Sequence, residues 1–317
     1  MRLGCDHVWV RVPATSANLG PGFDSLGLAL GVRDDLEVRA LGSPGVTVEV
    51  TGQGAHEVPD GETNLVVRAV RLALDEVGAP QTGLHLRCTN RIPHGRGMGS
   101  SAAAVVAGIL AVRGLIADPG ALDDAVALRL ATDLEGHPDN AAAAILGGAT
   151  IAWADRDGPR AVRVATAPGL MPVVLVPSAR LATARARSVL PAAVPHADAA
   201  FEAGRAALLV EALARRPDLL FPATADRLHQ SYRAVVMSDT IALVDALRAR
   251  GVAAVVSGAG PSVLVLARST GGGASDADDA VRSVFGGAMG GWQVIRPGVA
   301  DDGARVDRVP PSGVPAG

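Results

Sequence analysis

The chain has 317 residues and a net charge of −3, and it contains no lysine, so all 29 of its Lys and Arg residues are arginine. The lack of lysine excludes a Walker-type phosphate loop, a protein kinase and a pyridoxal-phosphate enzyme, because each of these needs a lysine on its phosphates or its cofactor. The arginines are scattered and the charge balance is slightly acidic, which argues against a nucleic-acid-binding surface.

The length suggests two domains of roughly 150 residues each. Cys5 and Cys88 are too few and too isolated for a disulfide framework or a zinc site. The opening residues 1–11 do not resemble a signal peptide, and the apolar run 102–112 is shorter than the ~20 residues of a membrane span. We therefore expect a cytoplasmic protein with no membrane or nucleic-acid partner.

The first half of the chain alternates between strand and helix patterns. A strand is expected at 8–12, and a polar, glycine-rich stretch at 14–28 separates it from later strands. Thr63 resembles an N-cap for the first helix. The remaining elements expected here are strands at 36–40 and 46–51, a helix at 65–77, a strand at 84–88, helices at 100–116 and 123–134, and a strand at 147–154.

Pro168 and Gly169 mark a domain boundary, because proline and glycine commonly punctuate such joins. After it the patterns predict a strand at 173–176, helices at 201–215 and 240–250, and strands at 253–257 and 263–267. The order favours the α+β class. We expect domains at 1–167 and 168–300, followed by a disordered, proline- and glycine-rich tail at 301–317.

The most informative segment is 91–104, RIPHGRGMGSSAAA, which follows a predicted strand and opens an apolar helix. Its alternate glycines, Gly95, Gly97 and Gly99, permit positive φ and let backbone N–H groups turn toward an anion. The helix start adds unpaired N–H groups and partial positive charge. Without lysine, backbone amides, a metal and arginine must neutralise a bound phosphate. A tight connection is the alternative, and Ser100 could cap the helix or reach a Mg²⁺ ion.

Three further loops carry polar groups beside glycine or proline. In PATSANLGPGFD, Asn18 and Asp24 could face one ligand, or the segment could be a structural turn. In LEGHPDN, His137 and Asn140 could orient a small polar substrate, although Asp139 or Asn140 could instead cap the next helix. SGAGPS is either a hairpin connection or backbone that approaches a ligand closely.

In this order, the segments PATSANLGPGFD, IPHGRGMGSSAAA, EGHPDN and SGAGPS resemble the homoserine kinases, a branch of the GHMP small-molecule kinase superfamily. The likeness covers Val10 to Leu266, with Met98 where the superfamily motif P-x-x-x-G-L-G-S-S-A-A has leucine. It implies a GHMP kinase fold, with an N-terminal domain like domain 2 of ribosomal protein S5 and a C-terminal ferredoxin-like α/β sandwich. The active site would lie between them.

The resemblance also implies where ATP, Mg²⁺ and L-homoserine would bind. The phosphates would lie on Pro93, His94, Gly95, Arg96, Gly97, Met98, Gly99, Ser100, Ser101, Ala102 and Ala103. Mg²⁺ would be held by Ser101, with Ser100 as second choice, and by Asp133, which stands at the first glutamate of the family's A-E-L-E-G. Because aspartate is one methylene shorter, a closer helix, a water or Glu135 could compensate. Substrate contacts map to Asn18, Asp24, His137, Asn140, Thr183, Arg187 and Arg233.

These residues suit an amino acid that carries a hydroxyl. Asp24 could pair with the ammonium, while Arg187 and Arg233 fork onto the carboxylate and leave the hydroxyl toward the γ-phosphate of ATP. No residue is an obvious general base, so we expect base-free transfer in which Arg187 and Asn140 position the reactants. The alternatives are another GHMP kinase or a catalytically silent nucleotide-binding member, and the second domain could offer a face for a homodimer.

Overall fold

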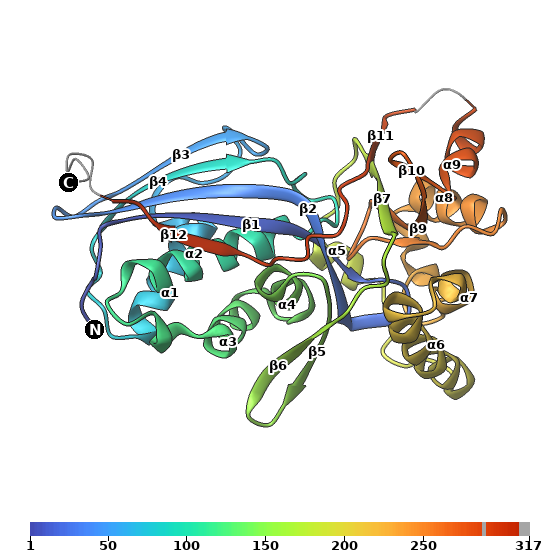
Figure 1. Cartoon of the computed structure of the whole chain (residues 1–317), viewed down its shortest axis with the longest axis horizontal. Coiled ribbons are helices and arrows are strands. Elements are labelled where there is room, and N and C mark those ends of the chain that lie inside the picture. The colour runs from blue at the N-terminus through green and yellow to red at the C-terminus, as the bar shows by residue number, and fades with distance from the viewer. Residues whose placement is uncertain (287–289, 311–317) are drawn as a thin grey trace.

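Two β-sheets organise the chain, one toward each end of the molecule in Figure 1. The computed structural model describes residues 1–286 and 290–310. Within those residues, a seven-stranded sheet belongs to the N-terminal part and a five-stranded sheet to the C-terminal part.

The seven-stranded sheet follows the order β12-β1-β2-β4-β3, with β5 paired to β2 and β6 to β5. Neighbouring strands are antiparallel except β3 and β4, which are parallel. The strands are β1 (His7–Asn18), β2 (Gly22–Leu41), β3 (Val46–Gly52), β4 (Gly83–Asn90), β5 (Ala149–Asp155), β6 (Gly158–Val164) and β12 (Arg305–Arg308).

Helices cover one face of this sheet (Figure 1): α1 (Leu65–Glu76), α2 (Ser100–Leu115), α3 (Asp124–Glu135) and α4 (Asp139–Leu146). Because α2 is apolar on nearly all sides, it is buried among the sheet and its helical neighbours. Asn64 caps α1 through its side chain, which accepts a hydrogen bond from the Val66 N–H at 2.9 Å. The N-cap expected at Thr63 is therefore wrong by one residue.

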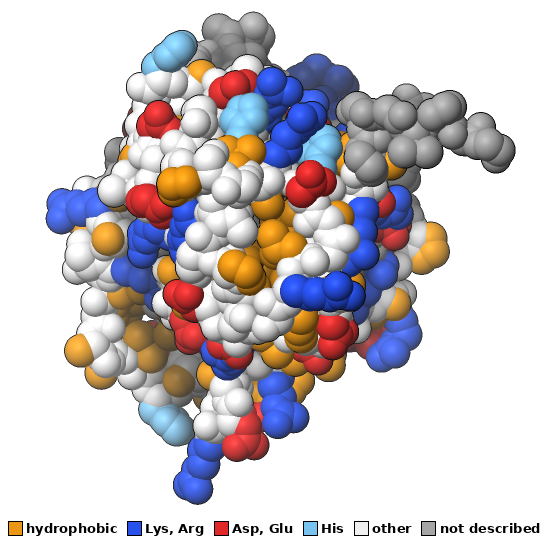
Figure 2. Space-filling view, turned by 90° about the vertical axis from the view of Figure 1, so that its left-hand side faces the viewer, with side chains coloured by type: hydrophobic (Ala, Val, Ile, Leu, Met, Phe, Trp, Pro, Cys, Tyr) orange, Lys and Arg blue, Asp and Glu red, His pale blue; other side chains and the backbone are white. Residues whose placement is uncertain are grey.

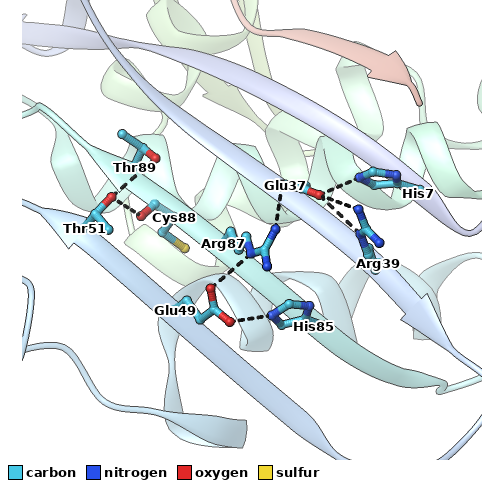
Figure 3. Close-up of polar contacts among 9 residues, drawn as sticks. All are labelled: His7, Glu37, Arg39, Glu49, Thr51, His85, Arg87, Cys88 and Thr89. Atoms are coloured by element: carbon cyan, nitrogen blue, oxygen red, sulfur yellow. Dashed lines mark hydrogen bonds and ion pairs between the residues drawn. The ribbon is translucent and has the colours of Figure 1, made fainter. Parts of the chain in front are cut away.

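The other face of the sheet is open and carries charged side chains that pair across strands (Figure 3). Glu37 on β2 accepts a hydrogen bond from His7 on β1 at 2.8 Å. Glu49 on β3 pairs with Arg87 and His85 on β4, each at 3.0 Å. Such cross-strand pairs favour the pairing of the strands and let a largely antiparallel sheet face water.

The five-stranded sheet has the order β10-β9-β7-β11, with β8 paired to β9. Its strands are β7 (Leu170–Pro177), β8 (Ala254–Val256), β9 (Val263–Gly271), β10 (Ala274–Ser275) and β11 (Trp292–Ile295). The helices of this part are α5 (Thr183–Arg187), α6 (His196–Ala214), α7 (Leu220–Ala223), α8 (Ser238–Arg248) and α9 (Asp278–Phe285). Strands change from one sheet to the other between β6 and β7, around the boundary expected at residue 167. We keep 1–167 and 168–300 as the proposed division.

One hydrophobic cluster joins the two parts. Leu19 at the tip of the β1–β2 hairpin belongs to the same cluster as Leu209 on α6 and Val255 on β8, and all three are fully buried. The hairpin tip is therefore held by the C-terminal part, so residues near it can form a site with residues of both parts.

The stretch 14–28, expected as a polar loop, is mostly strand. β1 continues to Asn18 and β2 resumes at Gly22, with positive φ at Asn18 (69°), Leu19 (52°) and Asp24 (53°). The small and polar side chains that made the stretch look like a loop are buried, because the hairpin packs against the glycine-rich loop and the C-terminal part.

The disordered tail expected from residue 301 is wrong for residues 301–310. β12 pairs with β1 in antiparallel register from Val8↔Arg308 to Arg11↔Arg305 (Figure 1). Arg308 donates hydrogen bonds to the Gly114 and Ile116 carbonyls at the end of α2, at 2.8 Å and 2.6 Å. These contacts order the segment despite its composition. The rest of the expected tail, 311–317, lies outside the described residues.

The surface at the N-terminal end of the molecule carries a mixture of charges. Figure 2 shows basic and acidic side chains interspersed around apolar ones on this face. Within residues 1–286 and 290–310, no helix is both long and apolar enough to cross a membrane.

Candidate active site

The glycine-rich loop connects β4 to α2 with three residues in the left-handed region: Gly95 at φ 63°, Gly97 at 70° and Gly99 at 68°. Gly99 is the N-cap of α2, and no side chain among the described residues caps this helix. Ser100 is therefore the first helical residue rather than a cap. The first N–H groups of α2 are left for a ligand, and together with the helix dipole they favour an anion.

At two of these positions only glycine fits, because another part of the chain lies very close to the backbone and because φ is positive. A Cβ on Gly97 would lie 2.1 Å from the Ser257 carbonyl oxygen, and one on Gly99 would lie 1.9 Å from Thr15 Oγ1. The Ser257 hydroxyl also lies 2.6 Å from the Gly97 carbonyl oxygen. SGAGPS, the connection between β8 and β9, thus packs directly on the loop, as the close-approach alternative proposed.

Arg96 anchors the loop rather than facing a phosphate. Its guanidinium donates to the carbonyls of Pro177 and Ser178, each at 2.8 Å, and to that of His94 at 3.2 Å. Among the other loop residues, Pro93, Met98, Ala102 and Ala103 are buried. Backbone N–H groups, not Arg96, are therefore left to meet a bound phosphate.

The carboxylate beside Ser101 is Glu135, at the end of α3. Ser101 Oγ donates to Glu135 Oε1 at 2.5 Å. Asp133, the first choice from the sequence, is not brought to this place: its side chain is 59% exposed and lies 3.6 Å from Arg129, one turn earlier on α3. Burial raises the pKa of Glu135, and the hydrogen bond from Ser101 opposes that rise.

A cavity of about 160 Å³ opens beside the loop and is lined by both parts of the chain. The structure brings most of the predicted substrate residues together there. Those that line it are Asn18, His137, Asn140, Thr183, Arg187 and Arg233, next to Gly95, Gly97, Gly99, Ser100, Ser101, Ala102 and Glu135.

Asp24 reaches this cavity through Arg187. The two form a bidentate pair, with Nη1 at 3.0 Å and Nη2 at 2.5 Å from the carboxylate oxygens. The hydrogen bonds that Arg187 donates to Asp24 raise the pKa of Arg187. Asn18 braces the arrangement, because it donates to the Gly258 carbonyl at 2.8 Å and accepts from the Asp24 N–H at 3.0 Å. The groups expected to bind the ammonium and the carboxylate of a substrate thus bond to each other here.

Arg233 is a buried cation beside the cavity. Its side chain is 1% exposed, Nη1 donates to the Gly258 carbonyl at 3.1 Å, and Nε has no partner among the described residues. Burial, followed by the charge of Arg187, lowers the pKa of Arg233 to about 10. A buried guanidinium with an unpaired donor indicates an anionic ligand, because such a group is costly to leave unmatched.

The LEGHPDN segment joins the two helices that face the cavity. His137 Nδ1 lies 2.8 Å from Asp139 Oδ1, and this hydrogen bond raises the pKa of His137. Asp139 is 2% exposed and also accepts from the Asn140 backbone N–H at 2.7 Å. His137 and Asn140 are therefore held by a common buried carboxylate.

A second, apolar pocket of about 240 Å³ lies on the other side of the loop and was not anticipated from the sequence. It shares Ser100 and Ser101 with the first cavity. Burial raises the pKa of Asp34, which lines it, to about 6. Its walls come from β2, β3, β4, α1, α2 and the segment before α1, and include Val50, Pro59, Asn64, Leu65, Cys88 and Ala104. Only the folded chain brings these segments together, so no motif could have signalled them.

A buried polar network behind the hairpin tip was also missed. His229 Nε2 lies 2.8 Å from the Gly20 carbonyl oxygen. Asp226 accepts from the backbone N–H groups of His229 and Gln230, and Glu202 on α6 accepts from that of Arg227 at 2.9 Å. Burial, followed by the neighbouring Asp226, raises the pKa of Glu202 to about 8. The buried surroundings of Glu202 thus favour its protonated form.

Comparison with known proteins gives the same family over most of the chain. The family models for the GHMP kinases N terminal domain and the GHMP kinases C terminal match residues 64–148 and 199–285. The chain is 52% identical over 300 residues to the homoserine kinase of Streptomyces coelicolor, an alignment that covers 94% of each chain. It is 57% identical over 265 residues to the homoserine kinase of Clavibacter michiganensis subsp. michiganensis, covering 84% of each.

Solved structures agree at the level of the fold. The crystal structure of homoserine kinase from Cytophaga hutchinsonii superposes with a TM-score of 0.81 at 26% identity, covering 96% of this chain and 98% of that one. L. major mevalonate kinase superposes with a TM-score of 0.63 at 18% identity, covering 93% of this chain and 96% of that one, a likeness of fold alone.

Proposed function

Because this chain belongs to the homoserine kinases of the GHMP kinase family, we propose that it transfers the γ-phosphate of ATP to the side-chain hydroxyl of L-homoserine. The product is O-phospho-L-homoserine, an intermediate in threonine biosynthesis. The α+β class and GHMP kinase fold expected from the sequence are confirmed.

Arg233 carries the proposal. A cavity of about 160 Å³ that holds one buried, incompletely paired guanidinium suits a small molecule with a carboxylate. Arg187 uses two of its five N–H donors on Asp24, so its remaining donors can reach the same substrate carboxylate. Asp24 would then receive the substrate ammonium. The hydroxyl end of the substrate would point to the glycine loop and α2.

ATP would span the two pockets that share Ser100 and Ser101. The nucleoside fits the apolar pocket, because aromatic bases favour apolar walls. The phosphates would lie on the N–H groups of the loop and of the α2 N-terminus, which compensate for the missing lysine.

Mg²⁺ fits beside Ser101 and Glu135, whose oxygens lie 2.5 Å apart, because this ion takes oxygen ligands and usually keeps only one or two protein ligands beside nucleotide phosphates. No group of three His, Cys, Asp or Glu in the described part of the chain could hold a metal unaided, as expected for an ion bound mainly through ATP. When bound, Mg²⁺ would neutralise charge on the phosphates. Glu135 replaces Asp133 in this proposal.

The transfer itself needs alignment rather than a base. Arg233, Arg187 and Asp24 would fix the amino-acid end of homoserine, so that the hydroxyl meets the phosphate in line. Asn140 would orient the hydroxyl, whose proton passes to the transferred phosphate. The cytoplasm is the compartment we propose, supported by the free thiols of Cys5 and Cys88. A homodimer stays a prediction that light scattering can check.

An ADP-release assay with homoserine, threonine, mevalonate and galactose tests this function. We expect turnover with homoserine to exceed that with the other three. Mevalonate and galactose lack the ammonium that Asp24 would receive, and the hydroxyl of threonine lies one carbon nearer the amino-acid end, away from the phosphate. Turnover of mevalonate but not of homoserine would identify another GHMP kinase. Tight binding of Mg·ATP without ADP release on any substrate would identify a catalytically silent member.

A further inference from the structure

Thr15 lies where the phosphate loop meets Asn140. Its side chain is fully buried in β1, and Oγ1 lies 2.8 Å from Asn140 Oδ1. Its backbone N–H donates to the Met98 carbonyl at 3.1 Å. Oγ1 approaches the loop so closely that only a glycine fits at position 99. Thr15 is thus the one hydroxyl among the described residues that this structure bonds to Asn140.

The partners of Asn140 determine which way its amide faces. On one side, Asp139 Oδ1 lies 3.2 Å from Asn140 Nδ2, and a carboxylate only accepts hydrogen bonds. The NH₂ group must therefore face Asp139, which leaves Oδ1 toward Thr15. On that side Thr15 must donate, because Oδ1 has no hydrogen. A flipped amide would place two acceptor oxygens against each other at Asp139 and lose that hydrogen bond, and its NH₂ would then donate to the Thr15 hydroxyl.

One N–H of Asn140 remains after these contacts. Nδ2 carries two hydrogens, and Asp139 takes one of them. Asn140 lines the cavity beside Gly99 and Ser100, so its second N–H is the donor available to a ligand there. The carbonyl oxygen is occupied by Thr15.

We propose that Thr15 is a positioning residue for the phosphoryl transfer: it holds the Asn140 amide so that an N–H, and not the carbonyl, meets the oxygen of the substrate hydroxyl. This inference rests on the proposed function. The hydroxyl oxygen then accepts from Asn140, which turns the O–H proton away from Asn140 and toward the phosphate.

The resulting step balances without a protein base. The hydroxyl oxygen forms a bond to the γ-phosphorus, and the bond from that phosphorus to the β,γ-bridging oxygen breaks, with its electron pair leaving on ADP. The hydroxyl proton moves to an oxygen of the transferred phosphoryl group. The backbone N–H of Thr15 also bonds to the Met98 carbonyl in the phosphate loop. Thr15 therefore fixes the position of Asn140, which donates to the substrate hydroxyl, relative to the loop that would bind the phosphates.

The test compares Thr15→Val, which keeps the shape and removes the O–H, with Thr15→Ser, which keeps the O–H. We expect Thr15→Val to lower kcat by about 10- to 100-fold, with the KM values for ATP and homoserine changed less than about threefold, because a misplaced hydroxyl slows transfer more than binding. Thr15→Ser should retain kcat within about threefold. A merely structural role would lower thermal stability without this split between kcat and KM.

A double-mutant cycle separates positioning from packing. In an Asn140→Ala background, Thr15→Val should cause no further loss of kcat, since the amide that it orients is gone. A full additional loss in that background, or wild-type kcat in the single Thr15→Val variant, would overturn the proposal.

The NMR signals of the Asn140 side chain test the role of Thr15 without turnover. They therefore test it independently of which substrate the enzyme uses. The chain has four asparagines, at 18, 64, 90 and 140, so the Asn140 side-chain NH₂ signals can be assigned by their loss in Asn140→Ala. Thr15→Val should shift these signals and Thr15→Ser should leave them near their wild-type positions. Unmoved signals in Thr15→Val would contradict the proposal even if homoserine is the substrate. Shifted signals would support it even if the wild-type enzyme prefers another hydroxyl substrate.

Discussion

At the scale of single residues, the metal site depends on which carboxylate of α3 faces α2. Asp133 and Glu135 are two positions apart, which places them roughly 200° around the helix from each other. The family pattern pointed to Asp133, but its side chain is exposed beside Arg129, whereas Glu135 bonds Ser101. Sequence alignment assigns a position, but the rotation of α3 against α2 decides which side chain faces inward.

The two carboxylates should differ sharply in a direct test. We expect Glu135→Ala to lower kcat/KM by roughly 100-fold or more, because it removes the proposed ligand of Mg²⁺. Asp133→Ala is the matched control and should stay within about threefold of wild type, as exposed ion pairs contribute little. Steady-state kinetics across a Mg²⁺ titration measures both, and the reverse order of losses would restore Asp133 as the ligand.

Glu202 gives the enzyme a pH-dependent stability. Its pKa is raised to about 8 in the folded protein, above the ordinary value for a glutamate, so the unfolded chain releases this proton at lower pH than the native state does. The protonated Glu202 makes its full contribution to the free energy of unfolding at acid pH. That contribution is lost as the pH rises toward 8. We expect Glu202→Gln, which cannot ionise, to become more stable relative to wild type over the same range.

Thermal melts would measure this effect. The difference in Tm between Glu202→Gln and wild type should grow by at least about 2 °C between about pH 5 and about pH 8. Glu211→Gln is the control on the same helix, because Arg215 holds the pKa of that exposed carboxyl below its usual value. The difference in Tm between Glu211→Gln and wild type should therefore stay constant over this pH range. A constant gap for Glu202→Gln would contradict the raised pKa.

At the scale of elements, apolar periodicity predicted the position of α1, α2, α3 and α8 to within a few residues, because each buries a regular stripe or a whole helix. It failed at 14–28, where Ser16 and Asn18 look like loop residues but are buried against the glycine loop and the C-terminal part. It failed again at β12, whose four residues lie in a segment rich in Gly, Pro and Asp. In both places tertiary partners outweigh local propensity.

The contact between β12 and the C-terminal end of α2 should contribute measurably to the free energy of unfolding. Arg308→Ala removes two charged hydrogen bonds to the carbonyls of Gly114 and Ile116, and we expect it to lower the free energy of unfolding by about 1.5–3 kcal/mol. Arg305→Ala, on the same strand, removes only an exposed pair with Asp302 and should change that free energy by less than about 0.5 kcal/mol. Urea unfolding compares the two, and equal effects would argue against the α2 contact.

At the scale of the whole molecule, the site exists only where the two parts meet. The sequence could name Asp24, Arg187 and Arg233 as substrate residues through the family likeness, and the structure brings all three to one cavity or its edge. It could not show that Asp24 pairs with Arg187, because these residues are 163 positions apart and their meeting depends on the docking of both sheets. The apolar pocket was missed for the same reason.

The place of β12 has a consequence for how the enzyme is made. The first sheet to emerge from the ribosome takes its outer strand from residues 305–308, close to the end of the chain, whereas the strands of the second sheet all lie between residues 170 and 295. Domains usually fold in the order in which they are synthesised, the N-terminal one first. Here the N-terminal sheet has to wait for β12, so the C-terminal sheet can form completely before it. Until residues 305–308 have left the ribosome, the edge of β1 stays unpaired and Arg308 cannot bond the end of α2, so the N-terminal part is completed only after the C-terminal sheet has been synthesised.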